Sequence, residues 1–331
     1  MMRVVHYGLG PIGAGIARLV AGRPDLQIVG AIDVDPNKVG RDVGLVIGLP
    51  NELGIRVSAD APGVLSATRP DVVVLATGSE LARVASQIRQ AIAVGASVVS
   101  TCEELSYPFD AHPELAQELD RLARGQGVVI LGTGVNPGFA MDTLPLALTA
   151  VSQRVDAVQV RRRQDAAHRR LPLQRKIGAG LAPAEFTERV RDGSVGHVGL
   201  PQSVQAIAHG LGWRLDRIEQ GIEPVLAAVE TRTDALVIPA GHVLGVRQTA
   251  RGVVSGRVVI ALELEISIGA KDPRDQVVIE GLPRINVVVN EGTHGDLATA
   301  AIVVNVMNHL RHVAPGLRIM ADLPLVHYRS A

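Results

Sequence analysis

The stretch VVHYGLGPIG, residues 4–13, decides the fold of this chain. Its first four residues are a short apolar run, and the three glycines that follow lead into a helical pattern of apolar residues over 14–20. A second apolar run, 27–32, ends in Asp33. A strand, a glycine turn, a helix and a second strand that ends in an acid together form the βαβ unit that binds dinucleotides.

Each part of this signature has its own physical role. Gly8 permits the tight turn, Gly10 lets the backbone approach a pyrophosphate, and Gly13 lets the helix pack closely on the strand. Pro11 fits near the first helical position, and the helix N-terminus offers N–H groups to phosphates. Asp33 follows Gly13 by 33 − 13 = 20 positions, the spacing at which an acid meets the ribose of NAD. The loop residues predicted to bind the cofactor are Gly8, Leu9, Gly10, Pro11, Ile12 and Gly13. The alternative interpretation is a glycine-rich turn in some other α/β protein.

The cofactor is predicted to be NAD or NADP. Asp33 favours NAD, because its charge repels a 2′-phosphate. Lys38 and Arg41 follow closely in the sequence and would permit some use of NADP.

Composition bounds the class of protein. The 331 residues suggest two domains, and 33 basic and 33 acidic residues give a net charge of zero, which argues against nucleic-acid and membrane-surface partners. A single cysteine, Cys102, excludes a disulfide framework within the chain, and no His/Asp/Glu spacing predicts a metal site. No apolar run approaches the roughly 18 residues of a membrane span. We see no signal peptide and expect a cytoplasmic location.

The first part of the chain alternates strands with helices. This alternation predicts an α/β fold with a Rossmann-type, doubly wound parallel sheet. Strands are expected at 71–76, 97–100 and 128–131, and helices at 80–94 and 113–124.

After about residue 150 the pattern changes to strands without long intervening helices. We therefore expect a second, α+β domain with a largely antiparallel sheet. Its strands are expected at 155–161, 235–239, 253–268, 276–280 and 286–289, and its helices at 183–191 and 201–211.

A last helix is expected over 296–310, capped near Asp296, and should return to the first domain. The predicted boundaries are 1–140 with 295–331 for a dinucleotide-binding domain and 141–294 for a substrate-binding and dimerisation domain.

Ligands of doubly wound sheets bind at the carboxyl ends of the strands, and several polar residues lie there. Asp33, Thr77, Glu103 and Asn136 all follow predicted strands. The Asn136 amide and its neighbouring backbone are candidates to hold a nicotinamide carboxamide or a substrate. Further cofactor contacts are predicted at Ala76, Thr77, Gly78, Thr101, Cys102, Asn136, Pro137 and Gly138.

Two adjacent carboxylates, Glu103 and Glu104, are the candidate catalytic residues. A carboxylate desolvated in a closed cleft can act as a general acid and base. Neighbours on an extended chain point in opposite directions, so one should face the ligand while the other caps the following turn. We favour Glu103; the alternative is that both are solvated loop acids. Cys102 lacks an apparent base and is expected to be a small buried residue.

Taken together, these motifs resemble the 2,4-diaminopentanoate dehydrogenases and the related native amine dehydrogenases. The resemblance rests on the glycine loop and on the stretches CEELSYP, GTGVNPG with Met141-Asp142, LQRKIGAG and GHVGLP, which begin at residues 102, 132, 173 and 196. The family's fold is similar to that of dihydrodipicolinate reductase.

The resemblance implies NAD(P)-dependent, reversible oxidative deamination of an amine, or reductive amination of a ketone with ammonia. It also implies a catalytic glutamate after the Ser-Thr-Cys strand and a homodimer built on the second domain's sheet. Substrate contacts are predicted at Phe139, Met141, His168, Lys176 and His197. A substrate carboxylate would need a basic clamp, for which Arg163, Arg170 and Lys176 are candidates.

Two other functions stay open at this point. One is reduction of a cyclic imine or a C=C bond, as in dihydrodipicolinate reductase, although the lysine-plus-histidine pair of those enzymes is not obvious here. The other is a non-catalytic, NAD-binding Rossmann protein. An amine dehydrogenase needs ammonia in the reducing direction, whereas an imine or C=C reductase does not. In a non-catalytic protein, no substrate should change the fluorescence of bound NADH.

Overall fold

The computed structural model describes residues 1–330, which form two compact units. The first unit comprises Met1–Phe139 together with the chain from His294 onward, and the second comprises Ala140–Thr293. The binding roles assigned to these two parts of the chain remain predictions.

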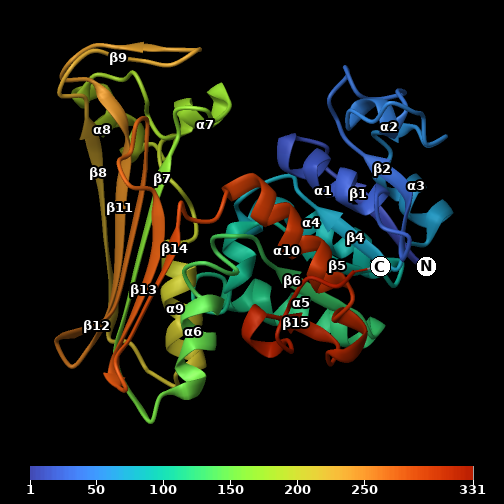
Figure 1. Ribbon diagram of the computed structural model, residues 1–331. Coiled ribbons are helices and arrows are strands. Elements are labelled where there is room, and N and C mark those ends of the chain that lie inside the picture. Colours follow the sequence, from blue (N-terminus) through green and yellow to red (C-terminus); the bar gives the residue numbers. More distant parts are fainter. Residues whose placement is uncertain (331) are drawn as a thin grey trace. The chain divides into compact units, whose positions relative to one another are not determined.

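The first unit is built on a seven-stranded sheet in which every strand pair is parallel. Its strand order is β15-β6-β5-β4-β1-β2-β3, the order of a Rossmann-type sheet with one strand added at the β6 edge (Figure 1). The predicted fold class is therefore confirmed. The strands are β1 (Met2–Tyr7), β2 (Leu26–Ile32), β3 (Val57–Ser58), β4 (Val72–Leu75), β5 (Ser97–Ser100), β6 (Val129–Gly132) and β15 (Gly316–Arg318).

Helices cover both faces of this sheet, so its strands are apolar on both sides. Along β4, Val72 and Val74 belong to one hydrophobic cluster, and Val73 and Leu75 belong to the other. The helices of this unit are α1 (Pro11–Ala21), α2 (Val43–Val46), α3 (Ala61–Thr68), α4 (Leu81–Ala93), α5 (Pro113–Gln126) and α10 (Gly295–Met307), with short 3-10 turns at η1 (Glu103–Ser106), η3 (Leu310–His312) and η4 (Met320–Asp322).

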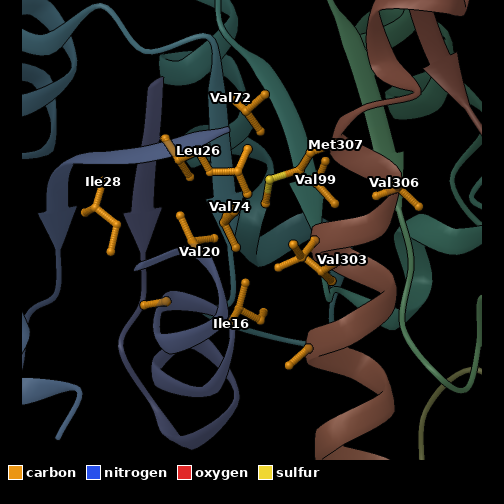
Figure 2. Close-up of a cluster of buried hydrophobic side chains, with 14 of the residues drawn as sticks. Ile16, Val20, Leu26, Ile28, Val72, Val74, Val99, Val303, Val306 and Met307 are labelled. Atoms are coloured by element: carbon orange, nitrogen blue, oxygen red, sulfur yellow. The ribbon is translucent and has the colours of Figure 1, made fainter. Parts of the chain in front are cut away.

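The C-terminal segment belongs to the first unit. Val303 and Met307 of α10 share a cluster with Ile16 and Val20 of α1, on the face that Val74 presents (Figure 2). Strand β15 pairs with β6. The helix itself begins one residue earlier than expected: His294, not Asp296, is its N-cap, because the His294 side chain accepts a hydrogen bond from the N–H of Leu297.

The second unit contains a mixed sheet of six strands in the order β14-β13-β7-β12-β11-β8. All neighbouring pairs are antiparallel except β7 with β12, which confirms a largely antiparallel sheet. The strands are β7 (Arg154–Asp165), β8 (Arg217–Leu226), β11 (Val243–Val254), β12 (Arg257–Ser267), β13 (Arg274–Leu282) and β14 (Ile285–Asn290), with a separate hairpin of β9 (Thr231–Arg232) and β10 (Val237–Ile238). The helical segments are α6 (Thr143–Leu148), η2 (Thr149–Val151), α7 (Leu171–Lys176), α8 (Pro183–Arg191) and α9 (Leu200–Gly210).

The prediction of a single strand over 253–268 was wrong. A hairpin turn divides this stretch at Ser255 and Gly256, whose φ angles are 49° and 75°. The chain therefore reverses between β11 and β12. Strand β8, which pairs with β11 along the edge of the sheet, was not predicted.

The two faces of this sheet differ in chemistry. One face carries Val160, Leu262 and Ala250, which lie next to one another across three strands and are buried. Helix α9 packs against β11 and β12, where Gly252 lies close to Val204. The opposite face, which we call the charged face, has acidic and basic strands in alternation: Glu219 and Glu223 on β8, Arg247 and Arg251 on β11, Glu263 and Glu265 on β12, and Arg161 and Arg163 on β7.

Candidate functional site

The glycine loop joins β1 to α1 with very little space around its backbone. Gly8 has a φ of +93°, and a Cβ there would lie 2.5 Å from the Ala76 carbonyl oxygen. A Cβ on Gly13 would lie 2.0 Å from the Gly8 carbonyl oxygen. Gly10 differs, because nothing lies within 4 Å of the position that its Cβ would take. Two glycines thus fit the helix onto the strand, and the third leaves its outer side open.

The open side of Gly10 lies at the N-terminus of α1. Gly10 is the N-cap of this helix and provides no side-chain cap, Pro11 stands in the first turn, and no acidic residue stands there. The first turn of a helix has N–H groups without intrahelical acceptors and a partial positive charge. This cradle fits the pyrophosphate of a dinucleotide.

Asp33 follows β2 and ties the glycine loop to it. Its Oδ2 accepts a 2.7 Å hydrogen bond from the N–H of Leu9 and a 3.1 Å bond from Lys38 Nζ, and its Oδ1 accepts from the N–H of Asp35. Partial burial raises the pKa of Asp33, but the backbone bonds from Asp35 and Leu9 and the contact with Lys38 together outweigh it and hold the pKa below its usual value. Asp33 therefore stands ionised beside the loop.

Neighbouring strands bring the other predicted residues to the same edge of the sheet. Strands β2, β1, β4, β5 and β6 are adjacent and parallel, so the residues that follow them lie along one edge. Thr77 follows β4, Thr101 follows β5 and Asn136 lies in the segment after β6.

The acidic pair does not lie on extended chain, contrary to expectation. Glu103 and Glu104 begin the 3-10 turn η1, where successive side chains are about 120° apart because the turn has about three residues. Glu104 Oε2 accepts a 2.7 Å hydrogen bond from the N–H of Leu81 and lies 2.9 Å from His112 Nε2. Glu104 thus caps a helix, but the helix is α4, which precedes it in the sequence. Glu103 is partly exposed.

Cys102 is a buried structural residue, as predicted. Its thiol donates to the Ser79 carbonyl oxygen at 3.2 Å, and burial raises its pKa to about 12. Such a thiol is not a nucleophile.

The segment after β6 is closely packed. Asn136, Pro137 and Gly138 are all buried. Gly138 has a φ of +124°, and a Cβ there would lie 2.5 Å from the Gly134 nitrogen.

In the second unit, two of the resembling stretches lie side by side. The N–H of Gly196 donates to the Lys176 carbonyl oxygen at 3.2 Å. Gln248 holds the backbone of His197 on both sides, accepting from its N–H at 2.7 Å and donating to its carbonyl at 3.1 Å. His168 and Lys176 are exposed, and His197 is partly exposed. No sequence pattern singled out Gln248, because it lies on β11, 51 positions from His197.

Two other predicted substrate contacts are less available. Met141, in the second unit, is fully buried, and Phe139 packs against the hydrophobic cluster of the first unit that includes residues of α1 and α10. Asp142, next to Met141, accepts hydrogen bonds from the N–H of Thr143 and from Ser203 Oγ. Asp142 therefore caps α6 and also has a buried partner on α9, Ser203, that spacing did not reveal.

Of the three arginines at 161–163, the central one differs from its neighbours in burial. Arg162 is buried and paired with Asp275 Oδ2 at 2.5 Å, and it also donates to Thr293. Arg163 lies on the charged face against Glu265, at 3.6 Å. The face opposite carries Gln248, which holds His197, so the sheet separates Arg163 from His197. Arg163 is therefore not part of a clamp with the His197 segment.

Two features are absent from residues 1–330. No group of three or more His, Cys, Asp or Glu side chains in that range could hold a metal ion. No helix there is both long and apolar enough to cross a membrane.

The fold and this edge of the sheet define a protein of the Rossmann class, with a helix N-terminus that fits the pyrophosphate of a dinucleotide. Residues 139–330 match the family model of the 2,4-diaminopentanoate dehydrogenase C-terminal domain. The chain is 31% identical to 2,4-diaminopentanoate dehydrogenase from Acetoanaerobium sticklandii, over 98% of this chain and 94% of that protein. It is 28% identical to an amine dehydrogenase from Streptomyces virginiae, over 98% and 97% of the two chains.

A solved structure agrees with this assignment. Amine dehydrogenase from Mycobacterium smegmatis superposes with a TM-score of 0.88 at 28% identity, covering 99% of this chain and 97% of that one. The chain belongs to the 2,4-diaminopentanoate dehydrogenase family and is an oxidoreductase that acts on amines.

Proposed function

We propose that the protein is an NAD(P)-dependent amine dehydrogenase that interconverts an amine with a ketone and ammonia. The observation that carries this proposal is the position of Glu103, which follows β5 on the edge of the sheet that also holds the glycine loop and Asp33. Family membership supplies the class of reaction.

The cofactor is proposed to lie along this edge. The first turn of α1 would bind its pyrophosphate, and Asp33 would bind the adenosine ribose. Residues after β4, β5 and β6, among them Thr77, Thr101 and Asn136, would hold the nicotinamide half. When bound, the nicotinamide accepts or donates the hydride, and the protein supplies orientation and charge.

Glu103 is proposed to carry the proton chemistry of the amine. Ammonium must lose a proton before it attacks a ketone, and the carbinolamine must be protonated to lose water. One carboxylate that cycles between base and acid serves both steps. Its negative charge also stabilises the cationic iminium that then forms.

NAD is proposed to be the preferred cofactor, because Asp33 repels a 2′-phosphate. Lys38 Nζ lies 3.1 Å from Asp33 and 3.4 Å from Asp35, so it offsets part of the acidic charge at this position. This offset supports a residual use of NADP.

Substrate contacts are proposed in the segments that Lys176 and His197 occupy. The hydrogen bond between Gly196 and Lys176 joins these segments, and both side chains reach solvent. Lys176 is the proposed partner of a substrate carboxylate, if the amine carries one, and Arg170 remains a second candidate.

A homodimer is proposed to form through the charged face. Arg247 and Arg251 are exposed there, and acidic strands alternate with basic ones across it. A two-fold axis places the same surface of both copies together, so acidic rows of one copy would oppose basic rows of the other. Arg247→Glu should therefore convert the dimer to monomers in sedimentation velocity, and an unchanged sedimentation coefficient would contradict this interface.

The catalytic proposal is tested by reductive amination of a panel of small ketones with NADH, with and without ammonia. We expect NADH oxidation that requires ammonia, and Glu103→Gln should lower kcat by about 10²–10⁴-fold, the contribution typical of a general acid and base. NADH binding, followed by fluorescence, should persist in the variant. Turnover without ammonia would instead indicate an imine or C=C reductase, and full activity of Glu103→Gln would refute the role of Glu103.

A further inference from the structure

The Glu104 carboxylate lies between the N-termini of two helices. The N–H that it accepts, from Leu81, belongs to the first residue of α4, and His112, 2.9 Å away, is the N-cap of α5. Carboxylates are stabilised at helix N-termini, where N–H groups lack intrahelical acceptors. Both contacts use the same oxygen, Oε2.

The turn that contains Glu104 is also tied to the loop between β4 and α4. The N–H of Glu104 and the thiol of Cys102 both donate to the Ser79 carbonyl oxygen, each at 3.2 Å. Together with the bond to Leu81, three contacts join residues 102–104 to residues 79–81. The neighbouring residues of this loop, Thr77 and Gly78, are among the proposed cofactor contacts.

We propose that Glu104 is a positioning residue, which fixes the turn that carries Glu103 against the cofactor loop between β4 and α4. This inference rests on the proposed function, because it takes Glu103 as the group that moves protons. Glu104 holds two helix ends and the loop together, and Glu103, on the next side of the 3-10 turn, is the proposed proton carrier. In this proposal Glu104 orients the turn and Glu103 transfers the proton.

Positioning has a large effect on rate, since a displacement of about 1 Å can cost on the order of 10²-fold. Glu104→Gln retains an oxygen acceptor for Leu81 but loses the charge, and Glu104→Ala loses both. We expect kcat to fall about tenfold in the first variant and about a hundredfold in the second. The KM for ammonia and the dissociation constant of NADH should change by less than about threefold.

The test compares these variants with a matched control. Arg89 and Glu118 join α4 to α5 by bonds of 2.8 and 2.9 Å, and neither touches the turn. Glu118→Gln therefore removes a charged contact between the same helices and should leave kcat unchanged. His112→Ala removes one partner of Glu104 from outside the turn and should lower kcat about threefold. This variant keeps the inference testable if Glu104→Ala fails to fold.

The pH profile of kcat separates positioning from proton transfer. Glu104→Gln should retain the pH dependence of the wild type at a lower rate, whereas Glu103→Gln should lose its acidic limb. Loss of that limb in Glu104→Gln would identify Glu104 as the acid and overturn the inference. Wild-type kcat in Glu104→Gln and His112→Ala would overturn it as well. Failure of the proposed function is distinguishable, because the wild type itself would then show no ammonia-dependent oxidation of NADH.

Discussion

His6 is a buried histidine that the fold keeps neutral. His6 lies on β1 between Ala31 of β2 and Val74 of β4, is fully buried, and has no hydrogen-bond partner for either ring nitrogen among the described residues. Burial lowers its pKa from 6.5 to about 3. Between these values the unfolded chain binds a proton that the folded chain does not, so the free energy of unfolding must fall as the pH falls.

The magnitude follows from the size of this window. At pH 4.5, two units below the unfolded pKa, the loss is about 2.7 kcal/mol, since each unit is worth about 1.36 kcal/mol. His6→Leu removes the titrating group at similar volume and should lack this loss. Carboxylates such as Asp25, whose pKa the Arg23 hydrogen bond lowers to about 2, also destabilise the fold in acid, but they are present in both proteins and cancel.

The assay is urea unfolding, followed by far-UV circular dichroism, at pH 7.0 and pH 4.5. The decrease in the free energy of unfolding should be about 2.7 kcal/mol larger in the wild type than in His6→Leu. The exposed His312 provides the matched control, because His312→Leu should retain the wild-type decrease. An equal decrease in wild type and His6→Leu would refute the reasoning that His6 is neutral in the fold.

Three further predictions follow from single contacts. Gly13→Ala should abolish either NADH binding or folding, because its Cβ would lie 2.0 Å from the Gly8 carbonyl oxygen. Circular dichroism reports folding and NADH fluorescence reports binding. Unaltered NADH binding would contradict the glycine geometry. Asp275→Asn should lower the free energy of unfolding by about 3–5 kcal/mol, because it leaves Arg162 buried without a counter-charge. Urea titrations measure this loss, and a loss below about 1 kcal/mol would contradict the prediction. Lys38→Met should weaken NADPH binding by up to about fivefold, which is the contribution of a partly exposed ion pair to the binding free energy. NADH binding should stay the same. Equal effects on the binding of both cofactors would exclude a role of Lys38 in selectivity.

Local patterns were sufficient for the first unit. Strands of a parallel sheet are apolar on both faces, so 71–76 stands out as a continuous apolar run, and the glycine loop fixes where the first crossover begins.

The second unit was harder to predict because its strands are long and polar on one side. The Ser255-Gly256 turn interrupts what looks like one apolar stretch, and both residues have a positive φ where the chain reverses. Strand β8 was missed because Gly221 and Pro224 break its alternation, which an edge strand tolerates.

Pairings between distant residues set the limit for the site. Arg162 and Asp275 are 113 positions apart, and no local signal identifies Asp275 as the partner of Arg162. The same holds for the acidic pair: the sequence placed both glutamates at the end of β5, but the choice between them depends on Leu81 and His112, which only the fold brings to Glu104.

The contacts of Asp33 bear on how cofactor preference can change in this family. The usual view treats this acid as a selector for the ribose, which could be replaced to admit NADP. Here the same carboxylate accepts the N–H of Leu9, so it also holds the glycine loop against β2. Replacing Asp33 would remove a repulsive charge and loosen the phosphate cradle at the same time, and the two effects oppose each other for NADPH. Lys38 affects only the net charge at this position, since its ammonium contacts the carboxylates of Asp33 and Asp35. Cofactor preference should therefore respond more cleanly to changes at position 38 than at position 33.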